Sequence, residues 1–320
     1  MRMLFAGTPD VAVPSLRALA STEGLEVAAV LTRPDAPKGR GRRLAPSPVK
    51  VAAGELGIEV IDDDPRSPGF IDRLKALDVE AAAVVAYGRI LSVDVLDALP
   101  KGWYNLHFSR LPQWRGAAPA QRAVWAGQRE TGSTVFRITR GMDEGPILLQ
   151  STNEIGEHET SGELLNRMAE LGAPLLVEAM LAVADGTAEP VAQPAEGVTI
   201  ADKIRTDDAH VDFHAPLEAV DRQIRACTPE PGAWAELYVA EDDAQPTVLH
   251  ILQAAPAPAD DPRVPETLAA GALLAGKKNV WAGTGTGVLE LTQVKAQGKK
   301  AMRAADWARG ARLGEGAHLA

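Results

Sequence analysis

Residues 81–87 read AAAVVAY, a continuous apolar run that predicts a β-strand buried on both faces. Segments with strand and helix patterns alternate on either side of this run. Strands are predicted at 2–7, 27–33, 58–61, 103–107 and 133–139, and helices at 9–20, 49–56, 70–77, 119–127 and 163–186. Such alternation predicts an α/β fold with a mostly parallel sheet and helices on both of its faces.

Two helix starts carry capping signals. Thr8 is followed by Pro9, which suits the first position of a helix, so we expect Thr8 to cap the helix 9–20. Thr160 and Glu163 have the T-x-x-E spacing of a capping box, in which each side chain bonds the backbone amide of the other residue. This box predicts the start of the long helix at 163–186.

A polar stretch with two prolines at 187–207 separates this half from a C-terminal half with a different pattern. Beyond it, a helix is predicted at 216–226 and short strands at 234–240, 247–253, 279–283 and 287–294. The sequence GTGTG at 283–287 lies between two of these strands and predicts a hairpin turn. We therefore expect the C-terminal half to form a small β-barrel or sandwich.

The bulk composition is that of an ordinary globular protein of about two domains. The chain has 320 residues, 46% of them hydrophobic, and a net charge of −10. Its only cysteine, Cys227, excludes an intramolecular disulfide and a cysteine cluster for zinc, and no other metal-ligand spacing occurs. No apolar run approaches the ~18 residues of a membrane span, and the N-terminus turns polar too early for a signal peptide. We expect a cytoplasmic protein that does not enter a membrane.

The turn after the first strand lacks the pattern of a nucleotide site. Gly7 stands alone where a dinucleotide fingerprint needs three glycines, and Pro9 removes an amide that a phosphate could bind. The G-x-x-x-x-G-K-[ST] phosphate loop is absent from the sequence. Neither NAD nor ATP is therefore an expected ligand.

Two basic islands interrupt the acidic composition. Residues 33–50 and residues 293–312 each carry six Lys or Arg side chains against a single Asp. One such island alone is more simply a solvated loop or helix face. Two of them in an acidic chain predict a local footprint for a polyanion.

The end of the strand 103–107 carries the residues with the clearest chemical potential. Asn105 and His107 are two apart, so their side chains share one face of the strand, at an end where open α/β sheets bind ligands. An amide and a protonated imidazole can both donate to a developing oxyanion. Asp143, in a glycine-flanked turn, would favour the protonated imidazole if it lies beside His107. From spacing alone, a surface histidine, a turn-forming asparagine and a loop-shaping aspartate stay open as explanations.

Several segments, taken in order, resemble the methionyl-tRNA formyltransferase family. They are FAGTPDVAVPSL (5–16), the loop at 33–50, VVAYGRIL (84–91), NLHFSRLPQWRGAAPAQRAVWAG (105–127), ETG (130–132), GMDEGPIL (141–148), ETSGELL (159–165) and GKKAM (298–302). The resemblance covers essentially the whole chain. The N-x-H…D set is common to transformylases that use 10-formyltetrahydrofolate, whereas the basic loop, the WRGAAPAQ run and GKKAM are more specific to the tRNA enzymes.

The resemblance implies a Rossmann-like formyltransferase domain with a parallel sheet, followed by a smaller OB-like β-barrel domain. We therefore expect a folate-binding catalytic domain at 1–189, a linker at 190–207 and a tRNA-binding domain at 208–320. The implied reaction is transfer of the formyl group of 10-formyltetrahydrofolate to the α-amino group of initiator methionyl-tRNA, for translation initiation. No metal is required for it, and we expect a monomer.

The resemblance also implies roles for individual residues. Asn105, His107 and Asp143 match the catalytic set. The folate-binding positions are matched by Ala86, Tyr87, Gly88, Ile90, Ser109, Arg110, Leu111 and Pro112. The tRNA-binding positions are matched by Lys38, Arg40, Arg42 and Arg43 in the loop 34–48, and by Lys299 and Lys300 near the C-terminus. Three positions depart from the family pattern: Phe108 replaces a usual Gly, Arg110 a usual Leu, and Glu144 a common Thr; we expect Glu144 to face solvent.

Three other functions are compatible with parts of this pattern. A transformylase that acts on a small amino-sugar or ribonucleotide would not need the two basic islands or the C-terminal β domain. A non-catalytic RNA-binding protein would leave Asn105, His107 and Asp143 unexplained, and a folate hydrolase would use water in place of the amine. A formyl-transfer assay with mixed acceptors separates the transferases, and binding of a folate analogue would count against the non-catalytic protein.

Overall fold

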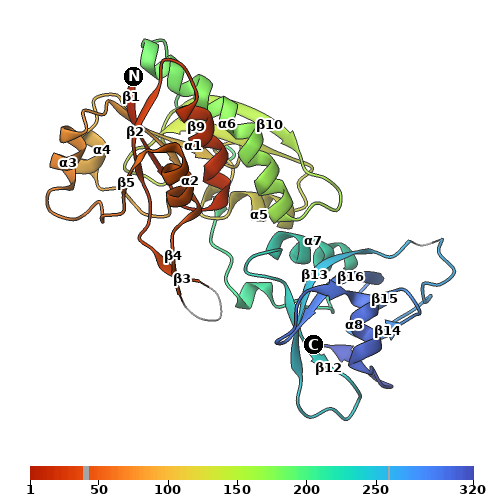
Figure 1. Ribbon diagram of the computed structural model, residues 1–320. Coiled ribbons are helices and arrows are strands. Elements are labelled where there is room, and N and C mark those ends of the chain that lie inside the picture. Colours follow the sequence, from red (N-terminus) through yellow and green to blue (C-terminus); the bar gives the residue numbers. More distant parts are fainter. Residues whose placement is uncertain (39–42, 259) are drawn as a thin grey trace. The chain divides into compact units, whose positions relative to one another are not determined.

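The computed structural model describes residues 1–38, 43–258 and 260–320, and this part of the chain divides into two compact units (Figure 1). The first unit consists of Met1–Pro119, Glu130–Glu154 and Leu165–Ala201. The second consists of Ala120–Arg129, Ile155–Leu164 and Asp202–Ala320. The domain limits at 1–189, 190–207 and 208–320 stay a prediction.

The first unit is built around a seven-stranded sheet in the order β10-β9-β7-β6-β1-β2-β5. Its strands are β1 (Arg2–Gly7), β2 (Glu26–Leu31), β5 (Glu59–Ile61), β6 (Ala81–Val85), β7 (Gly102–His107), β9 (Glu130–Arg137) and β10 (Ile147–Glu154). Neighbouring strands from β5 to β7 run parallel, whereas β9 is antiparallel to β7 and β10 is antiparallel to β9. The predicted mostly parallel sheet is confirmed, and β10 is an edge strand that the sequence pattern did not predict.

Helices cover both faces of this sheet, and alternation along each strand divides the core between them. On one face, Leu4 of β1 and Trp103 of β7 join a buried cluster with α3 (Phe70–Ala76) and α4 (Val93–Asp97). On the opposite face, Leu106 of β7 lies against α6 (Ser161–Asp185), where a Cβ on Gly172 would be 3.0 Å from Leu106 Cδ2. The first unit also contains α1 (Val13–Ala20) and α2 (Pro48–Leu56), whereas α5 (Pro119–Trp125) belongs to the second unit from Ala120 on.

The two predicted helix caps have different outcomes. Thr160 and Glu163 form the predicted capping box, because each backbone amide donates to the side chain of the other residue, at 2.9 and 3.3 Å. The cap predicted at Thr8 is wrong. Thr8 Oγ1 donates instead to Tyr87 O at 3.0 Å, and α1 begins at Val13 after a single 3-10 turn. The Thr8 hydroxyl therefore ties the turn after β1 to the loop after β6.

The second unit contains an antiparallel sheet in the order β14-β15-β16-β13-β12-β18, with β17 paired to β16. Its strands are β12 (Trp234–Tyr238), β13 (Thr247–Pro256), β14 (Leu273–Ala275), β15 (Val280–Gly283), β16 (Val288–Ala296), β17 (Met302–Arg303) and β18 (His318–Leu319). The predicted hairpin turn at 283–287 connects β15 to β16.

The two ends of this second sheet meet. Ala272, beside β14, forms an antiparallel bridge with His318 of β18, and Leu319 N donates to Gly271 O at 2.8 Å. The sheet therefore nearly closes into a barrel, as predicted. Helix α7 (Leu217–Cys227) contacts β13, and α8 (Ala304–Ala311), which the sequence pattern did not predict, contacts β16.

Within the described ranges of both units, every helix is too short or too polar to cross a membrane.

Candidate active site

Strand β7 carries Asn105 and His107 to its carboxyl end. The two side chains lie on one face of the strand and Leu106 lies on the other, as the period of two requires. His107 is 6% exposed, whereas Asn105 is half-buried. In the described part of the chain, the side-chain amide of Asn105 has no hydrogen-bond partner. That amide is available to donate to a ligand.

Asp143 reaches His107 from the connection between β9 and β10. Its Oδ2 atom lies 3.8 Å from His107 Nδ1, which is too long for a hydrogen bond but is an ion-pair distance when the imidazole is protonated. The backbone of Asp143 has a φ of 53°, a left-handed conformation that is uncommon for residues other than glycine. The structure therefore brings two of the three predicted catalytic residues into contact, through a turn that spacing alone could not place.

The other ring nitrogen of His107 contacts a backbone carbonyl. His107 Nε2 is 2.8 Å from Trp114 O, and because a carbonyl only accepts, Nε2 carries a proton and donates it. The ring also stands edge-on to Phe136, with centroids 6.3 Å apart and an interplanar angle of 87°. In the protonated ring, Nε2–H meets the Trp114 carbonyl and Nδ1–H faces the Asp143 carboxylate.

Gly116 fixes the carboxylate of Asp143. Its amide donates to Asp143 Oδ2 at 2.8 Å. Gly116 has a φ of 126°, and a Cβ at this position would lie 2.7 Å from Ala201 O, so another residue would clash with backbone. This close approach occurs because β8 (Arg115–Gly116) pairs in parallel with β11 (Ile200–Ala201).

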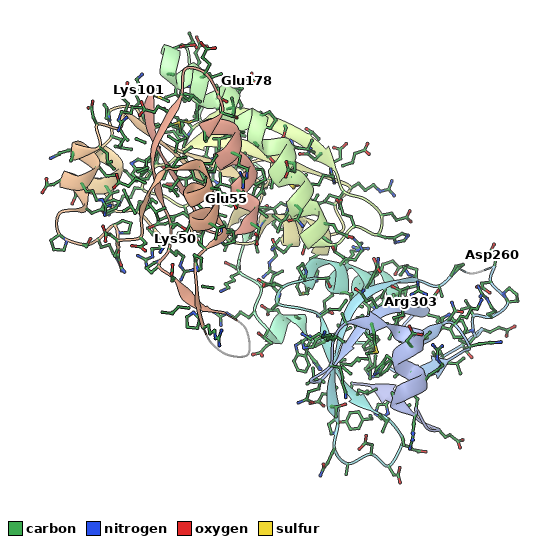
Figure 2. The ribbon with its side chains drawn as sticks, in the orientation of Figure 1. Lys50, Glu55, Lys101, Glu178, Asp260 and Arg303 are labelled. Atoms are coloured by element: carbon green, nitrogen blue, oxygen red, sulfur yellow. The ribbon has the colours of Figure 1, made fainter. Side chains whose placement is uncertain are left out.

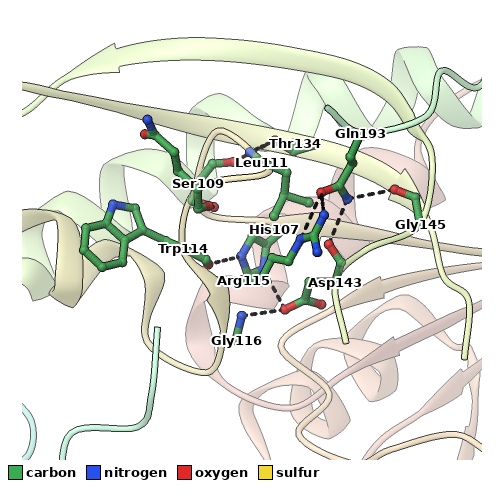
Figure 3. A network of polar contacts seen from close by, with 11 residues as sticks. His107, Ser109, Leu111, Trp114, Arg115, Gly116, Thr134, Asp143, Gly145 and Gln193 are labelled. Carbon is green, nitrogen blue, oxygen red and sulfur yellow. Dashed lines mark hydrogen bonds and ion pairs between the residues drawn. The ribbon is translucent and has the colours of Figure 1, made fainter. Parts of the chain in front are cut away.

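Gln193 contacts the Asp143 turn from a segment that the sequence predicted to be a linker. Its Nε2 atom donates to Asp143 O and to Gly145 O, both at 2.8 Å, and its Oε1 accepts from the guanidinium of Arg115 (Figure 3). Sequence reasoning missed this residue, because a lone glutamine in a polar, proline-containing stretch carries no motif.

A cavity of about 560 Å³ opens beside this network. Its lining includes Arg115, Glu144, Pro146, Gln193 and Val198, which come from the Asp143 turn and the segments around it. Neither His107 nor the predicted folate residues line it. Glu144 is exposed, as expected.

The predicted folate segment 109–112 is largely internal. Ser109 Oγ donates to Gln113 O at 2.6 Å, and Thr134 Oγ1 donates to Ser109 O at 2.7 Å. Leu111 N donates to Thr134 Oγ1 at 3.1 Å, and Pro112 is buried. Arg110 has the exposed side chain of this segment. Folate contact by these residues stays a prediction, with Arg110 as the side chain that solvent reaches.

The predicted folate loop 86–90 begins beside the end of β7. Val84 of β6 pairs with Asn105, so the residues that follow β6 leave the sheet next to His107. Ala86 and Gly88 have left-handed backbones, with φ of 47° and 78°, and Ile90 is 93% exposed. An apolar side chain so fully exposed beside a polar site is suited to contact an apolar part of a ligand.

Two buried groups are excluded as acids or nucleophiles near neutral pH. Burial raises the pKa of the Tyr87 hydroxyl to about 12. Burial also raises the pKa of the Cys227 thiol to about 12, so that thiol stays protonated. Over the described ranges, the structure contains no group of three His, Cys, Asp or Glu side chains that could hold a metal ion.

The basic loop after β2 contains a short antiparallel ladder, β3 (Ala36–Lys38) and β4 (Arg43–Ala45). Arg43 is exposed, whereas Arg40 and Arg42 fall within 39–42, outside the described residues. Lys50, labelled in Figure 2, stands at the end of this island. It forms ion pairs with Asp35 and Asp62 at 2.7 and 3.0 Å, so its charge is already compensated.

The second basic island begins in the last residues of β16 and continues through β17 and α8. Lys299 and Lys300 are exposed in the turn before β17, and Arg303, labelled in Figure 2, is exposed at the end of β17. These positive side chains lie on one short stretch of the second unit's surface. They are available to a negatively charged partner.

Comparison with known proteins covers both units. The formyl transferase family pattern matches residues 1–180, and the formyl transferase C-terminal domain pattern matches residues 203–312. The methionyl-tRNA formyltransferase of Bifidobacterium adolescentis is 63% identical over 314 residues, which are 98% of this chain and 98% of the relative. That of Bifidobacterium longum is 59% identical over 320 residues, again 98% of each chain.

A solved structure shares the fold. A sugar 3N-formyl transferase, crystallised in the presence of dTDP and 5-N-formyl-THF, superimposes with a TM-score of 0.63 at 16% identity. The match covers 94% of this chain and 99% of that chain. The likeness shows that the two-part architecture described above is one that formyl transferases adopt.

Proposed function

The chain belongs to the methionyl-tRNA formyltransferase family, and we propose that it transfers the formyl group of 10-formyltetrahydrofolate to the α-amino group of initiator methionyl-tRNA. The 63% identity over 98% of both chains carries the assignment of formyl transfer to methionyl-tRNA. The choice of donor, the preference for the initiator and the roles of individual residues belong to the proposal.

Asn105, His107 and Asp143 have different roles in the proposed mechanism. The unpaired amide of Asn105 donates to the formyl oxygen as it becomes negative during attack by the amine. Protonated His107 contributes positive charge, and it donates from Nε2 once its bond to the Trp114 carbonyl is exchanged for one to the oxyanion. Asp143 places a carboxylate beside Nδ1 of the charged ring and orients the ring, which the 3.8 Å contact supports.

The acceptor amine must be neutral when it attacks. An α-amino group has a reference pKa of about 8, so a usable fraction is neutral near pH 7. The proton that the amine loses passes through water near Asp143 to the departing nitrogen of the donor. The formyl carbon thus exchanges a bond to the donor nitrogen for a bond to the amine nitrogen, without a change in oxidation state.

A folate-derived donor fits the loop after β6 and the segment after β7. Exposed Ile90 offers an apolar surface to a ring system, and exposed Arg110 offers positive charge to carboxylates. The sugar formyl transferase of the same fold was crystallised in the presence of 5-N-formyl-THF, which supports a folate donor here. When bound, the donor supplies the formyl carbon, and residues 86–90 and 109–112 hold it beside Asn105.

Formyl transfer with matched acceptors tests the proposal. The wild-type protein, 10-formyltetrahydrofolate and either initiator or elongator methionyl-tRNA should give formyl-methionyl-tRNA, faster with the initiator. A control with an amino-sugar nucleotide as acceptor should give no product. Formylation of the sugar nucleotide, or release of formate without transfer to any acceptor, would favour one of the alternative functions.

We further propose that the protein acts as a cytoplasmic monomer.

The binding of tRNA should weaken steeply with salt. Each phosphate that a Lys or Arg neutralises contributes a slope of roughly −0.9 to log K against log salt concentration in duplex regions. Single alanine variants of Arg43, Lys299 and Lys300 should each make that slope less negative by about 1. Lys277→Ala, which removes an exposed lysine outside both islands, is the matched control. Affinity that does not change between low and moderate salt would exclude a tRNA footprint at these islands.

A further inference from the structure

We propose that Gln193 is a positioning residue that holds the Asp143 turn at the correct distance from His107. The segment Val191–Ala201 is then part of the catalytic centre. The inference rests on the proposed function, since it assigns a further residue to the same reaction. It also changes the expected role of this segment, which sequence alone indicates to be only a connection.

The side-chain amide of Gln193 makes all four hydrogen bonds that it can form. Nε2 donates to Asp143 O and Gly145 O, which flank a single residue of the turn, both at 2.8 Å (Figure 3). Oε1 accepts from Nε and Nη2 of Arg115, at 3.1 and 2.7 Å. A primary amide has two N–H donors and an oxygen with two acceptor positions, so the orientation of Gln193 is determined by all four bonds.

These bonds close a ring of contacts around the site. His107 donates to Trp114 O, Trp114 is joined covalently to Arg115, and Arg115 donates to Gln193. Gln193 then donates to Asp143, whose carboxylate returns to His107 at 3.8 Å. The separation of the His107 and Asp143 side chains is therefore set by contacts on each of them. Trp114 holds His107, and Gln193, which Arg115 links to Trp114, holds the Asp143 turn.

The segment that carries Gln193 is anchored at both of its ends. Val191 and Ile147 exchange two backbone hydrogen bonds, at 2.7 and 2.8 Å. Thr199 Oγ1 accepts from Trp114 N at 2.8 Å, directly before the β8–β11 pairing. Gln193 thus projects from a backbone that is itself fixed, so its amide acts as a rigid support for the turn.

Asp143 needs such a support. Its left-handed backbone, with φ of 53°, is unfavourable for an aspartate and persists where surrounding contacts impose it. Gly116 N holds the carboxylate, whereas Gln193 holds the backbone carbonyl. The contact with His107, at 3.8 Å, is too long to constrain the turn by hydrogen bonding.

Two variants of Gln193 test the proposal. Gln193→Ala removes the amide, and Gln193→Glu keeps its volume and an acceptor for Arg115 but removes both N–H donors. We expect both to lower kcat for formylation of methionyl-tRNA by about 10–100-fold, because a shift of ~1 Å in a catalytic group can cost ~100-fold. KM for the folate donor and for methionyl-tRNA should stay at the wild-type values, since no substrate contact is removed.

Gln223→Ala is the matched control. Gln223 Nε2 also donates to two backbone carbonyls, Asp208 O at 3.0 Å and His210 O at 2.7 Å, but in the second unit. Its loss should lower Tm about as much as Gln193→Ala and leave kcat unchanged.

The proposal is overturned if either Gln193 variant turns over at the wild-type rate, or if Gln223→Ala loses kcat equally. Failure of the proposed function looks different, because the wild type itself would then form no formyl-methionyl-tRNA. An active wild type with an equally active Gln193→Ala refutes only the positioning role.

Discussion

Replacement of His107 by alanine is expected to lower kcat for formyl transfer at least about 100-fold, because the loss of one donor to an oxyanion typically costs 10²–10³ in rate. The substitution removes the positive charge and leaves the Trp114 carbonyl without the N–H that bonds it at 2.8 Å. The measurement is single-turnover formylation of methionyl-tRNA with saturating donor. The affinity for methionyl-tRNA should not change, since the basic islands that we expect to bind it are untouched.

An exposed histidine provides the control for this variant. His158 is exposed in the connection before α6, and His158→Ala should turn over at the wild-type rate. Thermal unfolding separates catalytic from structural damage, because His107 is buried and its removal also costs packing. If folded His107→Ala transfers formyl groups at nearly the wild-type rate, His107 has no part in the chemistry.

Asp143→Asn is expected to lower kcat by a similar factor, about 100-fold, although the side chain keeps its shape. The amide oxygen can still accept from Gly116 N, so the turn should remain folded. The negative charge beside His107 Nδ1 is lost, however, so the positively charged ring no longer has a carboxylate partner. Turnover measured at constant tRNA occupancy tests this prediction, with KM for both substrates as a second readout.

The neighbouring carboxylate is a control for charge alone. Glu144→Gln removes one negative charge at the next residue, whose side chain is exposed. It should leave kcat unchanged, because that charge faces solvent. If Asp143→Asn and Glu144→Gln lower kcat equally, the total negative charge of the turn matters and the specific contact of Asp143 with His107 does not.

The parts of the site that follow from backbone periodicity were predictable. Asn105 and His107 share a face because strands alternate, and the first five residues of the run AAAVVAY form β6 because an unbroken apolar segment must be covered on both sides. The contact of Asp143 with His107 depends on a turn between β9 and β10, and β10 was itself not predicted. From the residues alone, the role of Asp143 was conditional on its lying beside His107; family resemblance supported that role, and the structure supplies the contact.

Polar contacts between distant segments were not predictable from local patterns. Thr8 has the sequence context of a helix cap, yet its hydroxyl bonds Tyr87 O, an acceptor 79 residues away. Gln193 has no context that distinguishes it from a loop residue, yet its amide bonds the turn of Asp143. In both cases the partner is a backbone carbonyl, which every residue has, so its identity leaves no trace in the sequence.

The inclusion of Val191–Ala201 in the first unit has a consequence for dividing the protein into fragments. A fragment that stops after residue 189 keeps every strand of the first sheet and the whole Asn105–His107–Asp143 set, but it lacks Gln193 and Thr199. A fragment that is meant to retain the supported Asp143 turn should therefore extend at least to Ala201. A cut near residue 190 that releases this segment is therefore expected to lower kcat at least as much as Gln193→Ala, because the same support of the Asp143 turn is lost.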